Sequence, residues 1–196
     1  MFGSIKYNLS HLLDFTGRDA RQTFWYYVLF LAVMKFAAGM AIAIPLMVNM
    51  FAQLFNAAKS GVTDQQAIND LMASQMGSWM QTTVPVSIVL GLVVMALFVA
   101  AFVRRLHDSD KPGWWVALPV VTQLIALGVS YSSLGKMQDY VTSAMQHPGT
   151  VDALQYQRDM AGLSLIGWIG YIAVIVFGVM KSTEGPNRYG DAPVRF

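Results

Sequence analysis

The sequence predicts an all-α integral membrane protein with four transmembrane helices and helical extensions beyond the membrane. Of its 196 residues, 55% are hydrophobic and only 12% are charged, a composition that does not suit a water-soluble globular domain. The apolar residues also gather into stretches close to the roughly 20 residues that a helix needs to cross a bilayer. We expect a single membrane domain over residues 1–196.

Each of four apolar stretches is predicted to form one span. In chain order they cover residues 24–48, 84–103, 114–131 and 163–180. The lysines and arginines between them are unevenly distributed. One side of the membrane would hold Lys6, Arg18, Arg21, Arg104, Arg105, Lys111, Lys181, Arg188 and Arg195, and the other Lys59, Lys136 and Arg158. Because basic residues concentrate on the inner side, we expect the N-terminus, the short middle loop and the C-terminus to be cytoplasmic.

The two outward connections, residues 51–83 and 132–162, are long for structureless loops and carry helix signals. Thr63 followed by Gln66 has the spacing of a capping box, and residues 147–149 (His-Pro-Gly) form a helix stop. We expect helical extensions of the spans. The alternative for the first connection is a flexible polar loop.

Composition excludes several kinds of site. The chain has no cysteine, which rules out disulfides, thiolate metal sites and cysteine nucleophiles. A net charge of +2 is too small to indicate a nucleic-acid partner. We predict no cofactor and no metal site.

Three polar motifs fall on the predicted cytoplasmic face: residues 14–27 (DFTGRDARQTFWYY), 103–115 (VRRLHDSDKPGWW) and 182–193 (STEGPNRYGDAP). In the first, Thr16 and Asp19 have capping-box spacing, and the spacing of Arg18, Arg21 and Trp25 predicts one face of a helix entering the membrane.

Turn residues mark the other two motifs. In the second, Pro112 and Gly113 predict a tight turn, after which Trp114 lies at interface depth. In the third, Gly185, Pro186 and Asn187 predict a turn that folds Arg188 and Tyr189 back toward the headgroups.

The three motifs together resemble one known family. F-x-G-R at residues 15–18, RRLHD at 104–108 with GWW at 113–115, and G-x-N-x-Y-G at 185–190 are similar to domain-of-unknown-function family 805, small proteins of the bacterial inner membrane. The resemblance implies the fold and the location, and it implies no activity. It does not account for the outer segments.

The charged end of the second span has three interpretations: a helix-end charge network, a site for a lipid headgroup or partner, and a catalytic site. Asp108 follows Arg104 by four residues and Arg105 by three, so helical spacing pairs it with them rather than with His107. The sequence contains no catalytic signature, and we expect no enzyme activity.

Lys35 lies 11 residues after Phe24, about 16 Å along the helix and near the bilayer centre, where a lone ammonium is costly. The spans contain no acid, so Gln123 and Tyr171, at similar depth, are its candidate partners in a polar centre. Alternatively, the side chain snorkels or the span is shifted toward an interface.

The leading hypothesis is a non-enzymatic membrane component whose cytoplasmic face binds anionic lipid headgroups or another membrane protein. The alternatives are a small transporter or channel subunit using Lys35, and a membrane enzyme acting on a phosphorylated lipid. The sequence leaves open whether the chain forms a homo-oligomer. The residues expected on the cytoplasmic face are Arg18, Arg21, Arg104, Arg105, His107, Asp108, Lys111, Trp114, Asn187, Arg188 and Tyr189.

Overall fold

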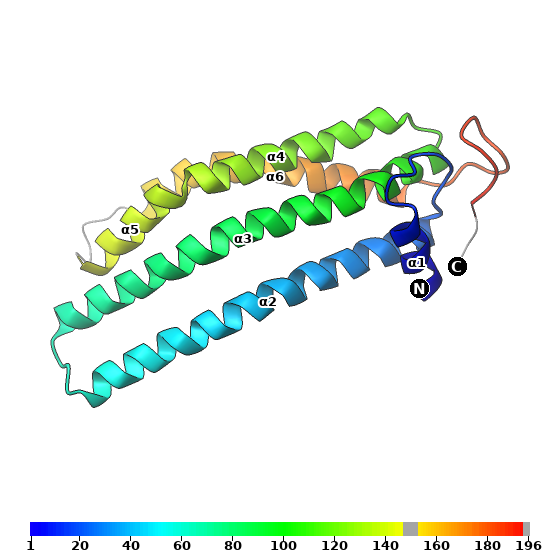
Figure 1. Ribbon diagram of the computed structural model, residues 1–196. Helices are drawn as coiled ribbons and strands as arrows, with labels where there is room; N and C mark the ends of the chain where they lie inside the picture. Colours follow the sequence, from blue (N-terminus) through cyan, green and yellow to red (C-terminus); the bar gives the residue numbers. More distant parts are fainter. Residues whose placement is uncertain (147–152, 194–196) are drawn as a thin grey trace. The chain divides into compact units, whose positions relative to one another are not determined.

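The structure is a computed structural model that describes residues 1–146 and 153–193, and its named elements are all helices (Figure 1). In chain order they are α1 (Phe2–Ser10), α2 (Arg21–Lys59), α3 (Gln65–Asp108), the 3-10 turn η1 (Gly113–Val116), α4 (Ala117–Ser132), α5 (Leu134–Gln146) and α6 (Ala153–Val179). Within the described ranges, the only β pairing is an isolated bridge between Asn187 and Gly190. The predicted all-α class is confirmed for this part of the chain.

Three helical stretches are long and apolar enough to cross a membrane: Arg21–Lys59, Gln65–Asp108 and Gly113–Ser132. They contain the first three predicted spans. In α6 the described apolar stretch, Leu165–Val179, is shorter. Large apolar side chains on these helices are exposed, among them Phe36 at 69% and Trp168 at 63%. Such surfaces fit a membrane protein, since exposed apolar side chains are stable against lipid.

The connection between the first two predicted spans, residues 51–83, consists mostly of helix. Helix α2 runs through Pro45 to Lys59, and α3 begins six residues later at Gln65 and runs through Pro85. The predicted helical extensions are therefore confirmed here, and the alternative prediction of a flexible polar loop is wrong.

The turn between α2 and α3 explains where both helices stop. Gly61 has φ +74°, and its N–H and that of Val62 bond back to Ala58 and Ala57 at 3.2 Å each, a Schellman ending. Helix α3 is capped by Asp64, whose carboxylate accepts the N–H groups of Gln66 at 3.3 Å and Ala67 at 3.2 Å. The predicted cap at Thr63 is wrong by one residue.

Between the third and fourth predicted spans, α5 and the start of α6 are helical. The predicted helix stop at residues 147–149 lies outside the described residues.

The chain forms two compact units. Unit 1 comprises Met1–Phe36, Leu90–Ala126 and Ser164–Phe196, and unit 2 comprises Ala37–Val89 and Leu127–Leu163. In unit 2, glutamines join the helices: Gln75 donates to Gln53 at 2.5 Å and Gln81 to Gln138 at 3.2 Å.

The core of unit 1 is aromatic. Phe24 and Tyr27 of α2 are fully buried against Phe102 and Leu106 of α3. The rings of Phe24 and Phe102 lie 6.0 Å apart, and Phe102 also meets Phe177 of α6. This core fixes the ends of three helices, beside which α1 and the turn after α6 lie (Figure 1).

Candidate functional site

Arg18 lies in the loop before α2, so the predicted helical face shared by Arg18, Arg21 and Trp25 is wrong. Gly17 has φ +79°, a left-handed conformation that ends any helical path before Arg18. The predicted capping box does not form either, because Thr16 bonds to Asp14 at 2.6 Å and α2 begins only at Arg21. The loop turns Arg18 inward, where its side chain is fully buried.

Arg18 joins the first motif to the other two. Its guanidinium donates to Oδ1 of Asp108 from Nε at 3.3 Å and from Nη2 at 3.1 Å. It also donates to the backbone carbonyls of Thr183 at 2.8 Å and Gly185 at 2.6 Å. A rigid, multi-donor guanidinium suits this set of acceptors, whereas a single ammonium does not.

Both carboxylate oxygens of Asp108 accept hydrogen bonds from neighbouring side chains. Its Oδ2 accepts Nη1 of Arg105 at 2.5 Å and the hydroxyl of Ser182, while Oδ1 holds Arg18. The predicted pairing of Asp108 with Arg105 is confirmed, and that with Arg104 is wrong. With both oxygens bound and no exposure, Asp108 has no free lone pair facing solvent.

Arg104 instead secures the N-terminal segment. It donates to the side chain of Asn8 at 2.6 Å and to the carbonyls of His11 at 2.8 Å and Asp14 at 2.5 Å. Its Nε lies 3.2 Å from Oδ1 of Asp19, a buried ion pair without hydrogen-bond geometry. Sequence reasoning missed α1 and Asn8, although Ile5, Leu9 and Leu12 follow a helical spacing.

Asp19, in the loop before α2, has a carboxyl pKa that is raised by its surroundings. Burial raises the pKa of its carboxyl from 3.8 to about 6, while the nearby Arg104 opposes the rise. Neither carboxylate oxygen accepts a hydrogen bond among the described residues, so the ion pair with Arg104 only partly offsets the burial of the ionised form.

Arg105 and Trp25 close the end of α6. Nε of Arg105 and Nε1 of Trp25 both donate to the carbonyl of Gly178 at 3.1 Å, and Arg105 also donates to the carbonyl of Met180. The last carbonyls of a helix have no partner inside the helix and attract cations, so this arrangement caps α6.

The third motif caps α3 in the same way. The side-chain amide of Asn187 donates to the carbonyl of His107 at 2.9 Å and to the hydroxyl of Thr183 at 2.8 Å. The ring of Tyr189 stacks on that of His107 with centroids 3.9 Å apart. Arg188 forms an exposed ion pair with Asp110 at 3.0 Å. The chain bends at Glu184 and Gly185, where Gly185 has φ +72°, but the hydrogen-bonded turn lies at Asn187–Gly190, later than the predicted turn at residues 185–187.

The three motifs thus meet in unit 1, and we call the residues that join them to one another and to the N-terminal segment the motif cluster: Arg18, Arg104, Arg105, Asp108, Thr183 and Asn187. A sequence model described as "Protein of unknown function (DUF805)" matches residues 12–191, a range that contains all six. The chain belongs to the DUF805 family. The resemblance drawn from the motifs is therefore confirmed. No curated protein and no solved structure matches the chain.

Some cations of this DUF805 chain remain accessible. Arg21, at the first position of α2, is exposed and has no ion pair or hydrogen bond among the described residues. It lines a polar cleft of about 510 Å³ with Ala20, Gln22, Lys181, Ser182, Thr183, Glu184, Gly185, Ala192 and Pro193, which we call the basic cleft. Lys111 is half-buried, and Trp114 is 63% exposed and stacks on Trp115.

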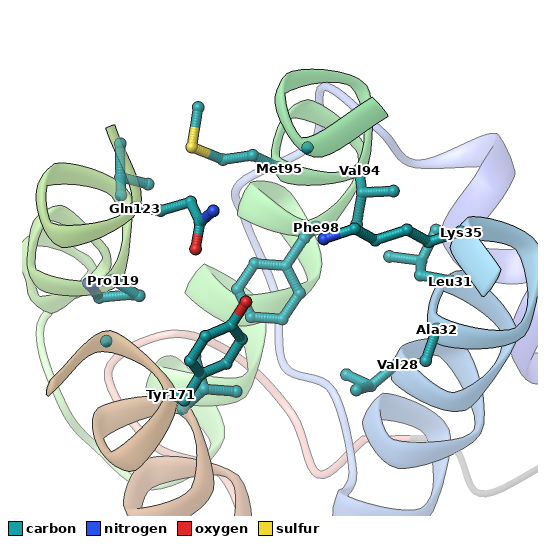
Figure 2. Close-up of a pocket in the computed structure, with 14 residues that line it drawn as sticks. Val28, Leu31, Ala32, Lys35, Val94, Met95, Phe98, Pro119, Gln123 and Tyr171 are labelled. Atoms are coloured by element: carbon teal, nitrogen blue, oxygen red, sulfur yellow. The ribbon is translucent and has the colours of Figure 1, made fainter. Parts of the chain in front are cut away.

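A second cavity lies among the apolar helices of unit 1. It has a volume of about 230 Å³, and Lys35, Gln123 and Tyr171 all line it. Figure 2 shows these three side chains pointing into the same space from α2, α4 and α6. The sequence places these three residues at similar depth along the helices, and the structure places all three around one cavity. We call this the lysine cavity.

No group of three or more His, Asp or Glu side chains gathers among the described residues. Asp108, the acid of the motif cluster, is bound by Arg18 and Arg105, so it serves hydrogen bonding and charge balance.

Proposed function

We propose that this DUF805 protein is a four-span protein of the bacterial inner membrane, with both termini cytoplasmic. The fourth span is residues 163–180, within and just after α6. The asymmetry of lysines and arginines supports this orientation. In this topology the motif cluster and the basic cleft lie at the cytoplasmic interface.

At that interface the protein acts without catalysis, by binding an anionic lipid headgroup in the basic cleft. The observation that carries this proposal is the contrast between the arginines. Arg18, Arg104 and Arg105 are buried and engaged by internal acceptors, so the headgroup site expected at Arg104 and Arg105 has no accessible donor. Arg21 is accessible and unpaired.

The position of Arg21 supports an anionic ligand. A cation at the first residue of a helix is opposed by the positive end of the helix dipole, so Arg21 does not stabilise α2 there. Together, the dipole and the guanidinium favour a negative group in the cleft. Lys181 adds a second cation, whose pair with Glu184 at 2.9 Å is 78% and 85% exposed and therefore weak.

Native mass spectrometry with phosphatidylglycerol tests the proposal. Wild type, Arg21→Gln and the control Arg188→Gln would be purified in detergent containing this lipid. Arg188 is a suitable control because it is an exposed cation of the same end that does not line the cleft. We expect Arg21→Gln to retain several-fold less lipid than the other two. Equal retention by all three would reject the basic cleft.

A second function is favoured by the lysine cavity: a transporter or channel subunit in which Lys35 forms part of a solute path. Flux into liposomes that is lost in Lys35→Met would support it. For the alternative enzyme, His107 and Asp108 would be the acid and base. The stacking of His107 on Tyr189 and the saturation of Asp108 support a structural role for both.

A further inference from the structure

We propose that the lysine cavity binds the anionic head of a single-chain amphiphile, a fatty acid or an alkyl phosphate monoester. This site is separate from the basic cleft: the two share no lining residue. The proposal rests on charge, on hydrogen-bonding capacity and on the size and lining of the cavity.

The charge of Lys35 has no counter-ion in the described structure. No Asp or Glu lines the cavity, and Lys35 has no ion pair or hydrogen bond among the described residues. Its helix is apolar over a long stretch, where an unbalanced ammonium is unfavourable. An anion bound in the cavity would neutralise it.

Two further donors face the same space. Gln123 offers amide N–H groups and Tyr171 a phenol O–H, and neither has a hydrogen-bond partner within the described ranges. With the ammonium they form a set of donors from three helices (Figure 2). A carboxylate or phosphate oxygen accepts from all three kinds of group, whereas a cationic ligand would be repelled by Lys35.

The remaining walls fit one hydrocarbon chain. Apart from the three donors, the lining residues are apolar or glycine, and they include Leu31, Val94, Met95 and Phe98. The volume of about 230 Å³ lies below the roughly 300–1,000 Å³ of sites for drug-sized ligands. A space of this size suits a small head and the adjoining part of one chain better than two acyl chains.

The test compares ligands that differ only in the head. Purified protein in a non-ionic detergent would be incubated with palmitate, hexadecyl phosphate or hexadecanol, and the bound amphiphile measured by native mass spectrometry. The variants are Lys35→Met, which keeps the chain length and suits an apolar helix, and Tyr171→Phe, which removes only the hydroxyl. Lys59→Met is the matched control, because Lys59 is an exposed lysine of the same helix outside the cavity.

We expect wild type and Lys59→Met to retain at least one anionic amphiphile at least tenfold more than hexadecanol. Lys35→Met should lose that preference, and Tyr171→Phe should weaken it several-fold. Stronger retention of palmitate or of hexadecyl phosphate identifies the head as carboxylate or phosphate. Retention of hexadecanol equal to both anions, or an unchanged preference in Lys35→Met, would overturn the proposal.

Arg21→Gln separates this inference from the proposed function. Because Arg21 does not line the lysine cavity, this variant should retain the amphiphile like wild type while losing phosphatidylglycerol. Loss of both ligands in Arg21→Gln would show that the two sites are not independent and would overturn the assignment of the amphiphile to Lys35.

Discussion

Arg18 donates two hydrogen bonds to a single carboxylate oxygen of Asp108, at 3.3 and 3.1 Å, across 90 residues of sequence. Asp108 is the common acceptor of two buried arginines, so it balances charge as well as holding the loop before α2. Removal of its charge leaves guanidinium groups buried without compensation.

We therefore expect Asp108→Asn to lower the free energy of unfolding by about 3–5 kcal/mol, the cost of breaking a buried ion pair. Asp110→Asn is the matched control, because Asp110 pairs with Arg188 at the surface and Asn tolerates its φ of 54°. It should cost at most about 1 kcal/mol. Thermal unfolding in detergent measures both, and similar losses in the two variants would contradict the assigned role of Asp108.

The pKa of Asp19 predicts a pH dependence. Because the pKa rises from 3.8 to about 6 on folding, the folded protein binds more protons than the unfolded chain between these values. The stability that Asp19 contributes is therefore fully present below pH 3.8 and is lost as the pH rises through about 6. At about 1.4 kcal/mol per pKa unit, the free energy of unfolding that is lost across this window is roughly 3 kcal/mol.

Asp19→Asn removes this titration. We expect the stability of the variant relative to wild type to increase between pH 4 and pH 7, as measured by thermal unfolding at a series of pH values. A constant difference between the two proteins would show that Asp19 does not titrate in this window.

Close packing of α4 and α6 predicts an effect at Gly170. A Cβ there would overlap Oγ1 of Thr122 and lie 3.1 Å from the backbone of Pro119, so the helices would have to move. Gly170→Ala should destabilise the protein by about 1–3 kcal/mol. Gly128→Ala in α4 is the control, since nothing lies within 4 Å of its Cβ position. In thermal unfolding, Gly128→Ala should melt no lower than wild type. A melting temperature of Gly170→Ala equal to that of Gly128→Ala would contradict the packing argument.

The absence of cysteine from the sequence makes the topology testable by single cysteine substitutions. Ser10 and Ser60 are both exposed and lie on opposite sides in the proposed orientation. A membrane-impermeant maleimide applied to cells with a permeable outer membrane should label Ser60→Cys directly and Ser10→Cys only after lysis. The reverse pattern would invert the orientation.

Periodicity and hydropathy predicted the helices well because both act over short distances. The apolar stretches lie within long helices, and the outer extensions are helical where described. The cap of α3 was misplaced because Thr63 and Asp64 are adjacent and both are good caps, so spacing alone could not choose between them.

The motif cluster could be predicted only in part. The pairing of Arg105 with Asp108 follows from a helical separation of three residues. The contacts of Arg18 with Asp108 and Thr183 depend on how distant segments pack, and no local pattern encodes this. The grouping of Lys35, Gln123 and Tyr171 was accessible because helical rise gives depth, although depth says nothing of which way each helix is rotated.

The backbone acceptors of Arg18 also set an order of assembly during synthesis. Thr183, Gly185 and Gly190 follow Arg18 by 165 to 172 residues, so the donors of Arg18 stay unfilled until α6 has been made. Packing of the helices therefore does not complete the loop before α2. That loop closes only when the segment after α6 folds onto it.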